Sequence, residues 1–482
     1  MSTNARDPLP PVIVGAGPAG IRAAQTLAAH GLRPVLIDEA ARGGGQIYRR
    51  PPAHFERSAH TLYGTEAARA TALHGTLDGL HGHIDYQPDS LVWNAHGGVL
   101  DVLHGPTQTT RSVAHGPLIV ASGATDRVLP LPGWTLPGVY TLGGAQVALK
   151  FQGCTIGRSV VLMGTGPLLY LVAYQYAKAG ASAGVNVAAV LDTARFADQW
   201  AALPGMLAQP AVLAKGLYYV GWLRAHGVPV HTGVQPVRIL GGKGPADAAR
   251  VAGVVWGDGH QEHTVPCDAV GFGYALRSET QLADLLGCRF AWAPLQRAHL
   301  PERDSAGRSS VPGVYLAGDG AGILGADAAE WAGERAALAL LADLGMAVDP
   351  ARAATLERQL AGLVRFRRGL ERAFPFPIQW AAQAPDDVVV CRCEHVTAGE
   401  LRACARDAGA DEMNRLKALT RVGMGRCQGR MCGVAAAEIL AQATGRPVEL
   451  VGRLRGQAPI KPIPIHLQAR AAEQGGAVEP AA

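Results

Sequence analysis

The sequence predicts an α/β protein with two Rossmann-like dinucleotide-binding domains, the first split by the second, followed by a small helical domain. Three observations predict this architecture. A complete glycine fingerprint lies at residues 15–20, a weaker one lies at residues 164–169, and four cysteines stand between residues 391 and 432. At roughly 150 residues per domain, the 482 residues of the chain, 48% of them apolar, allow two to three domains with large cores.

The first fingerprint stands in a complete strand–helix–strand unit. An apolar strand at 11–14 precedes Gly15-Ala-Gly17-Pro18-Ala19-Gly20, a helix follows to about residue 30, and a strand at 34–37 ends at Asp38-Glu39. In such a unit the first glycine makes the tight turn, the second lets a pyrophosphate approach the helix N-terminus, and the third lets helix and strand pack closely. We expect Asp38, with Glu39 beside it, to accept hydrogen bonds from ribose hydroxyls.

Three later segments resemble flavoproteins of the glutathione reductase type. They are Gly43-Gly44-Gly45-Gln46-Ile-Tyr-Arg-Arg50, Leu118-Ile-Val-Ala-Ser122-Gly123-Ala124 and Val314-Tyr-Leu-Ala-Gly318-Asp319. In that group the glycine loop wraps the pyrophosphate and the flavin ring, and the late aspartate meets the ribityl chain. The resemblance implies FAD, bound by Gly15, Gly17, Pro18, Ala19, Gly20, Asp38, Glu39, Gly44, Gly45, Gln46, Ser122, Gly123, Gly318 and Asp319.

The second unit lies between the two halves of the first and departs from the fingerprint. A strand at 159–163 leads into Gly164-Thr-Gly166-Pro-Leu-Leu169, a helix runs to about residue 179, and a strand at 185–191 ends at Asp192. Leu169 replaces the third glycine and weakens close packing of helix on strand. An acid at Asp192 prefers a free ribose hydroxyl, which favours NAD over NADP. We favour a relic fold without a hydride donor; bound NAD or ATP at Gly164–Gly166 is the alternative.

The four cysteines read Cys391-Arg-Cys393 and, after 33 further residues, Cys427-Gln-Gly-Arg-Met-Cys432. Four thiolates are a usual ligand set for an iron–sulfur cluster. The spacing resembles bacterioferritin-associated ferredoxin (BFD), and that resemblance implies a 2Fe–2S cluster. A structural zinc is the less favoured alternative, since C-x-C is an unusual zinc spacing.

Composition and the remaining cysteines narrow the possible functions. No apolar run of 18 or more residues predicts a membrane span, and a net charge of +5 does not indicate a nucleic-acid surface. We interpret Cys154, Cys267 and Cys288 as buried thiols and Cys404 as a small core residue. Such unpaired thiols favour a reducing compartment, so we expect a cytoplasmic protein, with a peripheral position at the inner membrane as the alternative. The basic run at 365–368 is either a solvated helix face or a partner interface.

Two absences also bear on function. No cysteine pair follows the glycine loop at 43–46 or lies near 143–146, so thiol–disulfide chemistry is not expected. The sequence contains no motif that indicates a general base, so the catalytic residues are unknown. The expected divisions are 8–155 with 270–348 for the split FAD domain, 156–269 for the second domain, 349–385 for a helical connector, 386–455 for the cluster domain and 456–482 for the tail.

The order of these motifs, from residue 10 to about 455, resembles one group of proteins. It is similar to the FAD-binding subunit of opine oxidases, D-hydroxyproline dehydrogenase, dye-linked proline dehydrogenase and hydrogen cyanide synthase. The resemblance implies a partner subunit like D-amino-acid and sarcosine oxidases, which oxidises the amine on its own flavin. It also implies a small ferredoxin-like subunit in some complexes, and a chain that relays electrons to an acceptor.

Three functions therefore compete. The first is the relay subunit of a heteromeric amino-acid dehydrogenase. The second is a stand-alone NAD(P)H-dependent ferredoxin-type reductase with a fused cluster domain, against which Leu169 argues. The third is a cluster-binding scaffold without turnover, against which the intact FAD motifs argue.

Overall fold

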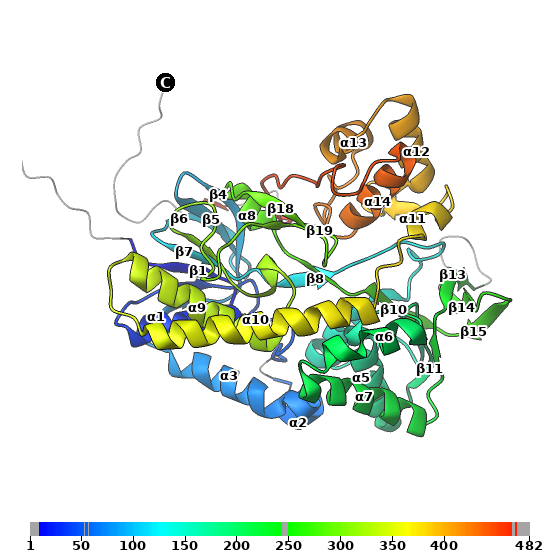
Figure 1. Cartoon of the computed structure of the whole chain (residues 1–482), viewed down its shortest axis with the longest axis horizontal. Helices are drawn as coiled ribbons and strands as arrows, with labels where there is room; N and C mark the ends of the chain where they lie inside the picture. The colour runs from blue at the N-terminus through cyan, green and yellow to red at the C-terminus, as the bar shows by residue number, and fades with distance from the viewer. Residues whose placement is uncertain (1–8, 53, 56, 243–248, 465–467, 470–482) are drawn as a thin grey trace, which may run out of the picture.

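The computed structural model describes the chain as two α/β domains side by side, with a helical domain at the upper right of the view (Figure 1). The described residues are 9–52, 54–55, 57–242, 249–464 and 468–469. None of the helices in this part of the chain combines the length and the apolar character needed to cross a bilayer.

The first domain is built on a five-stranded parallel sheet. The strand order is β20-β7-β1-β2-β3. Their bounds are Val314–Leu316, Leu118–Val120, Val12–Val14, Val35–Ile37 and Asp85–Gln87. β2, β7 and β20 are buried throughout, as their Val, Leu and Ile residues favour when both faces of a parallel sheet are covered.

Different elements cover the two faces of this sheet. On one side α1 (Pro18–Ala29) packs against α9 (Ala326–Asp343), and a Cβ on Gly333 of α9 would lie 2.0 Å from the Ala19 carbonyl oxygen. On the other side lies an antiparallel sheet of β4 (Ser90–His96), β5 (Val99–His104) and β6 (Thr109–Ala114), which shares a core with the parallel strands. This layering leaves the carboxyl ends of the parallel strands free to hold a ligand.

The second domain has the strand order β12-β11-β10-β16-β9; four strands repeat the order of the first sheet, but the edge strand β9 precedes the fingerprint strand in the chain, whereas β20 follows it. The bounds are Val230–Thr232, Asn186–Asp192, Ser159–Thr165, Ala269–Tyr274 and Val139–Thr141. The helix after the fingerprint, α5, spans Pro167–Ala183, and a three-stranded antiparallel sheet is formed by β13 (Gln235–Gly241), β14 (Val251–Gly257) and β15 (Glu262–Pro266).

The expected divisions at 155/156 and 269/270 do not follow the sheets. β9 pairs with β16, and β16 pairs with β10, so residues 139–141 and 269–274 belong to the second domain. The two chain segments that connect the domains pair with each other as an antiparallel ribbon of β8 (Ala124–Asp126) and β17 (Leu276–Ser278). Hydrogen-bonded strand partners, which have no local signal, decide these boundaries.

The predicted connector is a long helix, α10 (Pro350–Ala373), which runs along both α/β domains (Figure 1). Its start packs on α9 and its later part packs on α6 (Phe196–Met206), where a Cβ on Gly369 would lie 2.7 Å from the backbone of Gly205. Within the basic run, Arg367 is half-buried in an ion pair with Glu371, whereas Arg365 and Arg368 are exposed.

The helical domain at the C-terminus is formed by β21 (Val389–Cys391), β22 (Val396–Thr397), α12 (Ala398–Asp407), α13 (Met413–Thr420) and α14 (Gly433–Thr444). A capping box begins α12: the Thr397 hydroxyl accepts from the Glu400 N–H, and the Glu400 carboxylate accepts from the Thr397 N–H. Helix α11 (Trp380–Gln383) packs against α14.

The other elements are short or lie at the periphery. They are α2 (Ala59–Tyr63), η1 (Gly64–Glu66), α3 (Ala67–Gly79), α4 (Leu142–Val147), the π-helix η2 (Ala148–Gln152), α7 (Pro210–Ala225), α8 (Gln281–Leu285), β18 (Phe290–Ala293), β19 (Ala298–Pro301), η4 (Gly318–Ala321) and β23 (Gln468–Ala469).

The cysteines outside the quartet are placed mostly as predicted. Cys267 and Cys288 are buried, and Cys404 is half-buried against the core of the helical domain. The prediction for Cys154 was wrong, because this thiol is exposed. It follows the π-helix η2 and the left-handed turn at Gly153, which carry the chain out of the core before β10 begins.

Candidate cofactor sites and the interface between them

The first fingerprint forms a tightly packed turn at the carboxyl end of β1. Gly15 has φ of +107°, and a Cβ there would lie 2.3 Å from the Ala121 carbonyl oxygen. A Cβ on Gly20 would lie 1.8 Å from the Gly15 carbonyl oxygen. These contacts give Gly15 and Gly20 the turn-forming and packing roles that the sequence predicts.

Gly17 differs, because its missing side chain leaves open space. It is the residue before α1, and the nearest atom to a Cβ built there is the Cα of Gly45 at 3.7 Å. The glycine loop lies beside it: the Gly44 N–H donates to the Ala16 carbonyl oxygen at 2.8 Å. Backbone from 15–20 and 43–45 thus meets at a helix N-terminus, the arrangement that binds a pyrophosphate.

The two acidic residues at the end of β2 have different partners. Asp38 accepts from the Ala16 N–H at 2.5 Å and from the Ala40 N–H at 2.7 Å. Burial raises the pKa of Asp38, and these two hydrogen bonds oppose that rise. Glu39 is exposed and pairs with Lys461. The contact of either carboxylate with a ribose stays a prediction.

The predicted FAD segment that ends at Gly318 and Asp319 packs beside the start of α1. A Cβ on Gly318 would lie 2.9 Å from the Cβ of Ala19, so β20 brings Gly318 onto the first turn of α1. Asp319 accepts from the N–H groups of Leu324 and Gly325 at 2.9 and 3.0 Å, which fixes the loop before α9. Pro18 and Ala19 are buried under this contact.

Three of the predicted FAD-binding positions, Ser122, Gly123 and Gln46, also have hydrogen-bond partners within the protein. Ser122 donates its hydroxyl to the Glu279 carbonyl oxygen at 2.6 Å, and the Glu279 N–H donates to the Gly123 carbonyl oxygen at 3.0 Å. Ser122 and Gly123 therefore join β7 to the segment after β17. Gln46 is exposed, and its side-chain oxygen accepts from Arg49.

The second nucleotide unit is closed at the position of the ribose acid. Asp192 is fully buried, accepts from the Tyr170 hydroxyl at 2.7 Å and accepts from the Ala194 N–H at 2.9 Å. Burial raises the pKa of Asp192 to about 6. Leu169 is fully buried as well, and the Phe374 ring at the end of α10 lies against Tyr170. The carboxylate that would bind the ribose of a dinucleotide is thus already hydrogen-bonded to groups of the protein.

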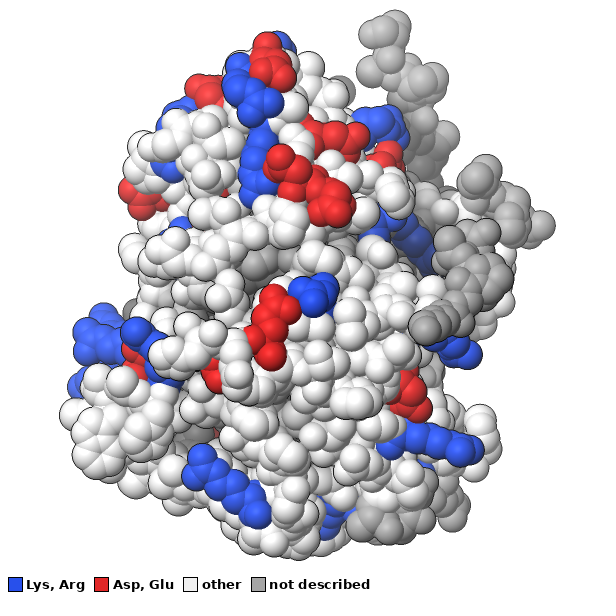
Figure 2. Space-filling model, turned by 90° about the vertical axis from the view of Figure 1, so that its right-hand side faces the viewer, with Lys and Arg blue, Asp and Glu red and all other residues white. Residues whose placement is uncertain are grey.

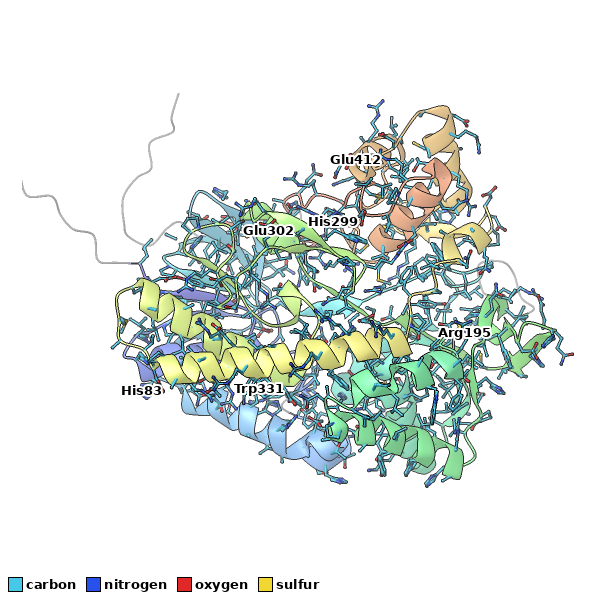
Figure 3. All side chains as sticks on the ribbon, viewed as in Figure 1. His83, Arg195, His299, Glu302, Trp331 and Glu412 are labelled. Atoms are coloured by element: carbon cyan, nitrogen blue, oxygen red, sulfur yellow. The ribbon has the colours of Figure 1, made fainter. Side chains whose placement is uncertain are left out.

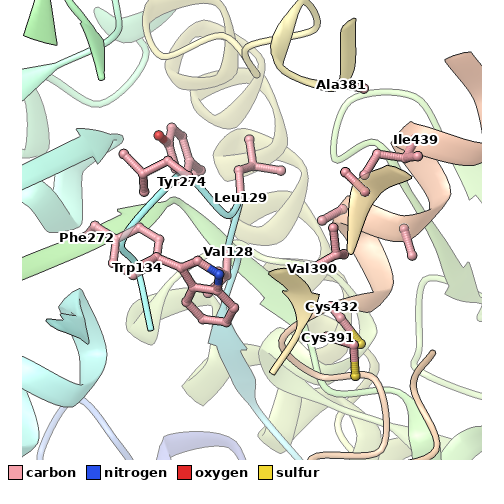
Figure 4. Packing of buried hydrophobic residues seen from close by; sticks show 14 of the residues in the cluster. Val128, Leu129, Trp134, Phe272, Tyr274, Ala381, Val390, Cys391, Cys432 and Ile439 are labelled. Atoms are coloured by element: carbon pink, nitrogen blue, oxygen red, sulfur yellow. The ribbon is translucent and has the colours of Figure 1, made fainter. Parts of the chain in front are cut away.

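The four cysteines meet in the helical domain, where β21 and the loop before α14 come together. The Cys432 thiol is in hydrogen-bonding contact with Cys391 and Cys427, and Cys393 is in contact with Cys427. Figure 4 shows Cys391 and Cys432 side by side below Val390. The contact with Cys432 lowers the pKa of Cys391 to about 6 and that of Cys427 to about 5. Such thiols are poised to act as thiolate ligands.

The arrangement of the sulfurs also bears on the kind of metal. Among the described residues, no three Cys, His, Asp or Glu side chains are arranged to hold a single metal ion. Cys391, Cys393, Cys427 and Cys432 would together hold a cluster, since four cysteines are a usual ligand set for iron–sulfur clusters. Cys391 and Cys432 are buried and Cys393 is exposed, so the row of four sulfurs runs from the domain interior to the surface.

The loop between Cys427 and Cys432 docks on the first domain through a buried ion pair. Arg430 bonds both oxygens of Glu279 at 2.6 and 3.0 Å. Burial alone would raise the pKa of Glu279, but Arg430 outweighs it and holds the pKa below its usual value. A second ion pair, between the half-buried Arg297 and the buried Glu438 at 2.6 Å, ties the turn before β19 to α14.

The tail adds a third connection. The Ile460 side chain is buried in the first domain, its N–H donates to Trp93, and its carbonyl oxygen accepts from Arg430. Near this junction a cleft remains, lined in part by His299, Glu302 and Glu412 (Figure 3). The sequence predicted only that a tail begins at residue 456, so these contacts were missed.

Comparison with known proteins agrees with this arrangement. The family model of pyridine nucleotide-disulphide oxidoreductases matches residues 10–337. The chain belongs to this family. The BFD-like [2Fe-2S] binding domain matches residues 389–442, which include all four cysteines. The predicted fold class is thereby confirmed, as is the pair of cofactors, FAD and a 2Fe–2S cluster; the zinc alternative is not supported.

Two curated relatives span nearly the whole chain. An opine oxidase subunit of Agrobacterium tumefaciens (strain Ach5) is 36% identical over 94% of this chain and 90% of its own. Hydrogen cyanide synthase subunit HcnB of Pseudomonas aeruginosa is 37% identical over 95% and 97%. The L-proline dehydrogenase from P. horikoshii shares the fold, with a TM-score of 0.68 and 19% identity over 96% of this chain and 79% of that one.

The residues present fit both groups. Gly17 keeps open the space beside Gly45 that a pyrophosphate would fill, and the sulfur row offers four cysteine ligands. When bound, the flavin accepts two electrons and can pass them on singly to a cluster that carries one at a time. The protein is thus a flavin- and cluster-dependent oxidoreductase. Sequence reasoning missed Glu279 and Arg430, although Arg430 stands inside the cysteine motif.

Proposed function

We propose that this chain is the electron-relay subunit of a heteromeric FAD-dependent amino-acid dehydrogenase of the opine, D-hydroxyproline, proline or glycine type. A partner subunit like D-amino-acid or sarcosine oxidases takes hydride from the substrate C–N bond on its own flavin. The electrons then pass through this chain to an acceptor. The observation that carries the proposal is the direct docking of the cysteine loop on the FAD domain through Arg430 and Glu279.

The names of the relatives support the heteromeric part of the proposal. Both the opine oxidase relative and HcnB are named as subunits, and each matches this chain over nearly its full length. The alpha subunit of sarcosine oxidase from Rhizobium meliloti, 23% identical, covers 90% of this chain with 39% of its own length. A small ferredoxin-like subunit is part of the proposal for complexes that contain one.

An apolar surface supports a partner as well. Six large apolar side chains are exposed between residues 196 and 218, on and between α6 and α7. They are Phe196, Trp200, Leu207, Val212, Leu217 and Tyr218. Phe196 and Trp200 stack on each other with ring centroids 6.5 Å apart. The right-hand side of the molecule carries large uncharged areas (Figure 2). Subunit interfaces favour such exposed aromatic residues.

The relay is favoured over a stand-alone NAD(P)H-dependent reductase by the second nucleotide unit. Its acid, Asp192, is held by Tyr170 and Ala194, and Leu169 fills the place of the third glycine. A nicotinamide donor would have to displace these contacts. We place the complex in the cytoplasm, and at the inner membrane where the acceptor is a quinone.

Anaerobic mixing separates the two functions. The purified chain with bound FAD should show no saturable flavin bleaching with micromolar NADH or NADPH. The same chain, assembled with its amine-oxidising partner, should be reduced when the amino-acid substrate is added. Rapid, saturable reduction by NADH of the chain alone would favour the reductase and overturn the relay.

A further inference from the structure

Arg277 is a half-buried cation at the interface between the FAD domain and the cysteine loop. It lies on β17, beside the buried Ser278. Its Nη1 donates to the carbonyl oxygens of Gly429 and Arg430 at 3.2 and 3.1 Å. The neighbouring acid, Glu279, is already engaged at both oxygens by Arg430. Among the described residues no carboxylate forms an ion pair with Arg277.

The charge of Arg277 faces the cysteine ligands. Its two carbonyl partners belong to the loop that joins Cys427 to Cys432, and its Nη1 lies 3.8 Å from the position of a Cβ on Gly433. The nearby anions that act on it are Glu279, Cys432 and Cys427. Burial lowers the pKa of Arg277, as expected for a cation removed from water.

Buried charges are stable in proteins when an opposite charge accompanies them. Four thiolates and two sulfides outweigh the charge of two irons, so a 2Fe–2S cluster held by cysteines is an anion, and an added electron makes it more negative. Net charge and hydrogen bonds at the sulfurs are among the main determinants of a cluster's reduction potential. A bound cluster would therefore supply a second anion beside Arg277, whose other anionic neighbour, Glu279, is already paired with Arg430.

We propose that Arg277 is the internal counter-ion of the 2Fe–2S cluster, which holds the cysteine loop on the FAD domain and raises the reduction potential of the cluster. Arg277 acts through its charge and touches no substrate, so it is a positioning residue. The inference rests on the presence of the cluster and is independent of the direction in which electrons flow.

The test is an EPR-monitored redox titration of the anaerobically purified chain, with iron and FAD quantified beside it. Arg277→Gln removes the charge and keeps a donor, whereas Arg277→Lys keeps the charge. For Arg277→Gln we expect the equilibrium constant of one-electron reduction to fall about tenfold or more, and tenfold corresponds to a shift of 59 mV. Arg277→Lys should restore most of the potential.

A matched control separates charge from loosened docking. The double variant Arg297→Gln/Glu438→Gln removes another ion pair at the same interface without changing the net charge. An unchanged potential in Arg277→Gln, or an equal shift in the control, would overturn the proposal. If Arg277→Gln loses its iron, Arg277→Lys decides: iron retained at near wild-type potential supports the charge role, and iron lost in both variants refutes it. No partner or substrate enters this titration, so its failure is distinct from failure of the relay.

Discussion

The two dinucleotide-binding units share the order of four parallel strands but differ where each fingerprint meets its helix. In the first unit Gly17 faces open space beside Gly45, and Asp38 stands at the edge of that space. In the second unit Leu169 is packed in the core, and Asp192 is sealed by Tyr170. The Rossmann topology is therefore kept where side chains fill the nucleotide position, because the contacts that hold the sheet together are not those that line the nucleotide site.

Gly17→Val should have the largest effect on this contrast. A side chain at Gly17 meets only Gly45 at 3.7 Å within the protein, so the variant should fold, but it occupies the place of the pyrophosphate. Overpacking of about 1–3 kcal/mol predicts FAD binding weaker by about 10- to 100-fold. FAD content after gel filtration measures it. Gly166→Ala, at the corresponding position of the second unit, should keep FAD although the φ of +105° at Gly166 makes that variant less stable. Stoichiometric FAD in folded Gly17→Val would show the assignment to be wrong.

Cys427→Ser tests whether the flavin depends on the first unit alone. The variant should lose most of its iron, because an incomplete ligand set opens the cluster to solvent, and it should keep FAD. In the assembled complex substrate should still reduce the partner's flavin, while transfer to an external dye fails. Metal analysis, the FAD spectrum and dye reduction measure the three effects. Unchanged dye reduction without iron would remove the cluster from the electron path.

Replacing Asp192 and replacing Asp38, the acids at the strand ends of the two units, should change the free energy of unfolding in opposite directions. Asp192 has a pKa raised to about 6, so ionisation of this buried acid costs folding free energy above its unfolded value of about 3.9. The cost is absent below pH 4, grows between pH 4 and 6 and is complete above pH 6. Asp192→Asn should therefore stabilise the protein at pH 7.5 by about 1–3 kcal/mol, since the Tyr170 hydroxyl can reverse its hydrogen bond.

Asp38→Asn should not stabilise the protein in the same way. Both oxygens of Asp38 accept from backbone N–H groups, and an amide NH2 would face one of those donors. We expect a loss of about 1–3 kcal/mol from the unmade hydrogen bond. Thermal unfolding of both variants at pH 4.5 and 7.5 measures the difference. A gain of stability in both, or in neither, would contradict the proposed closure of the second unit.

Local sequence predicted the parts whose geometry is itself local. Gly15 and Gly20 occupy a turn and a helix–strand contact that admit no side chain, so their residue type is dictated within a few positions. The quartet from Cys391 to Cys432 was recognisable because thiolate ligands leave a spacing in the chain. The exposed Cys154 was predicted wrongly, because the turn at Gly153 that directs it outward carries no distinctive pattern.

The sequence by itself thus determined the two nucleotide units, the cysteine cluster and the order in which they occur, because glycine turns and ligand spacing act over short stretches. Only the tertiary structure decided that β9 and β16 join the second sheet, that Tyr170 seals Asp192, and that Arg277 stands behind the cysteine loop. Arg277 lies 152 residues before Gly429, to which it donates. Contacts between such distant residues depend on how whole domains dock, and no local pattern of residue types records them.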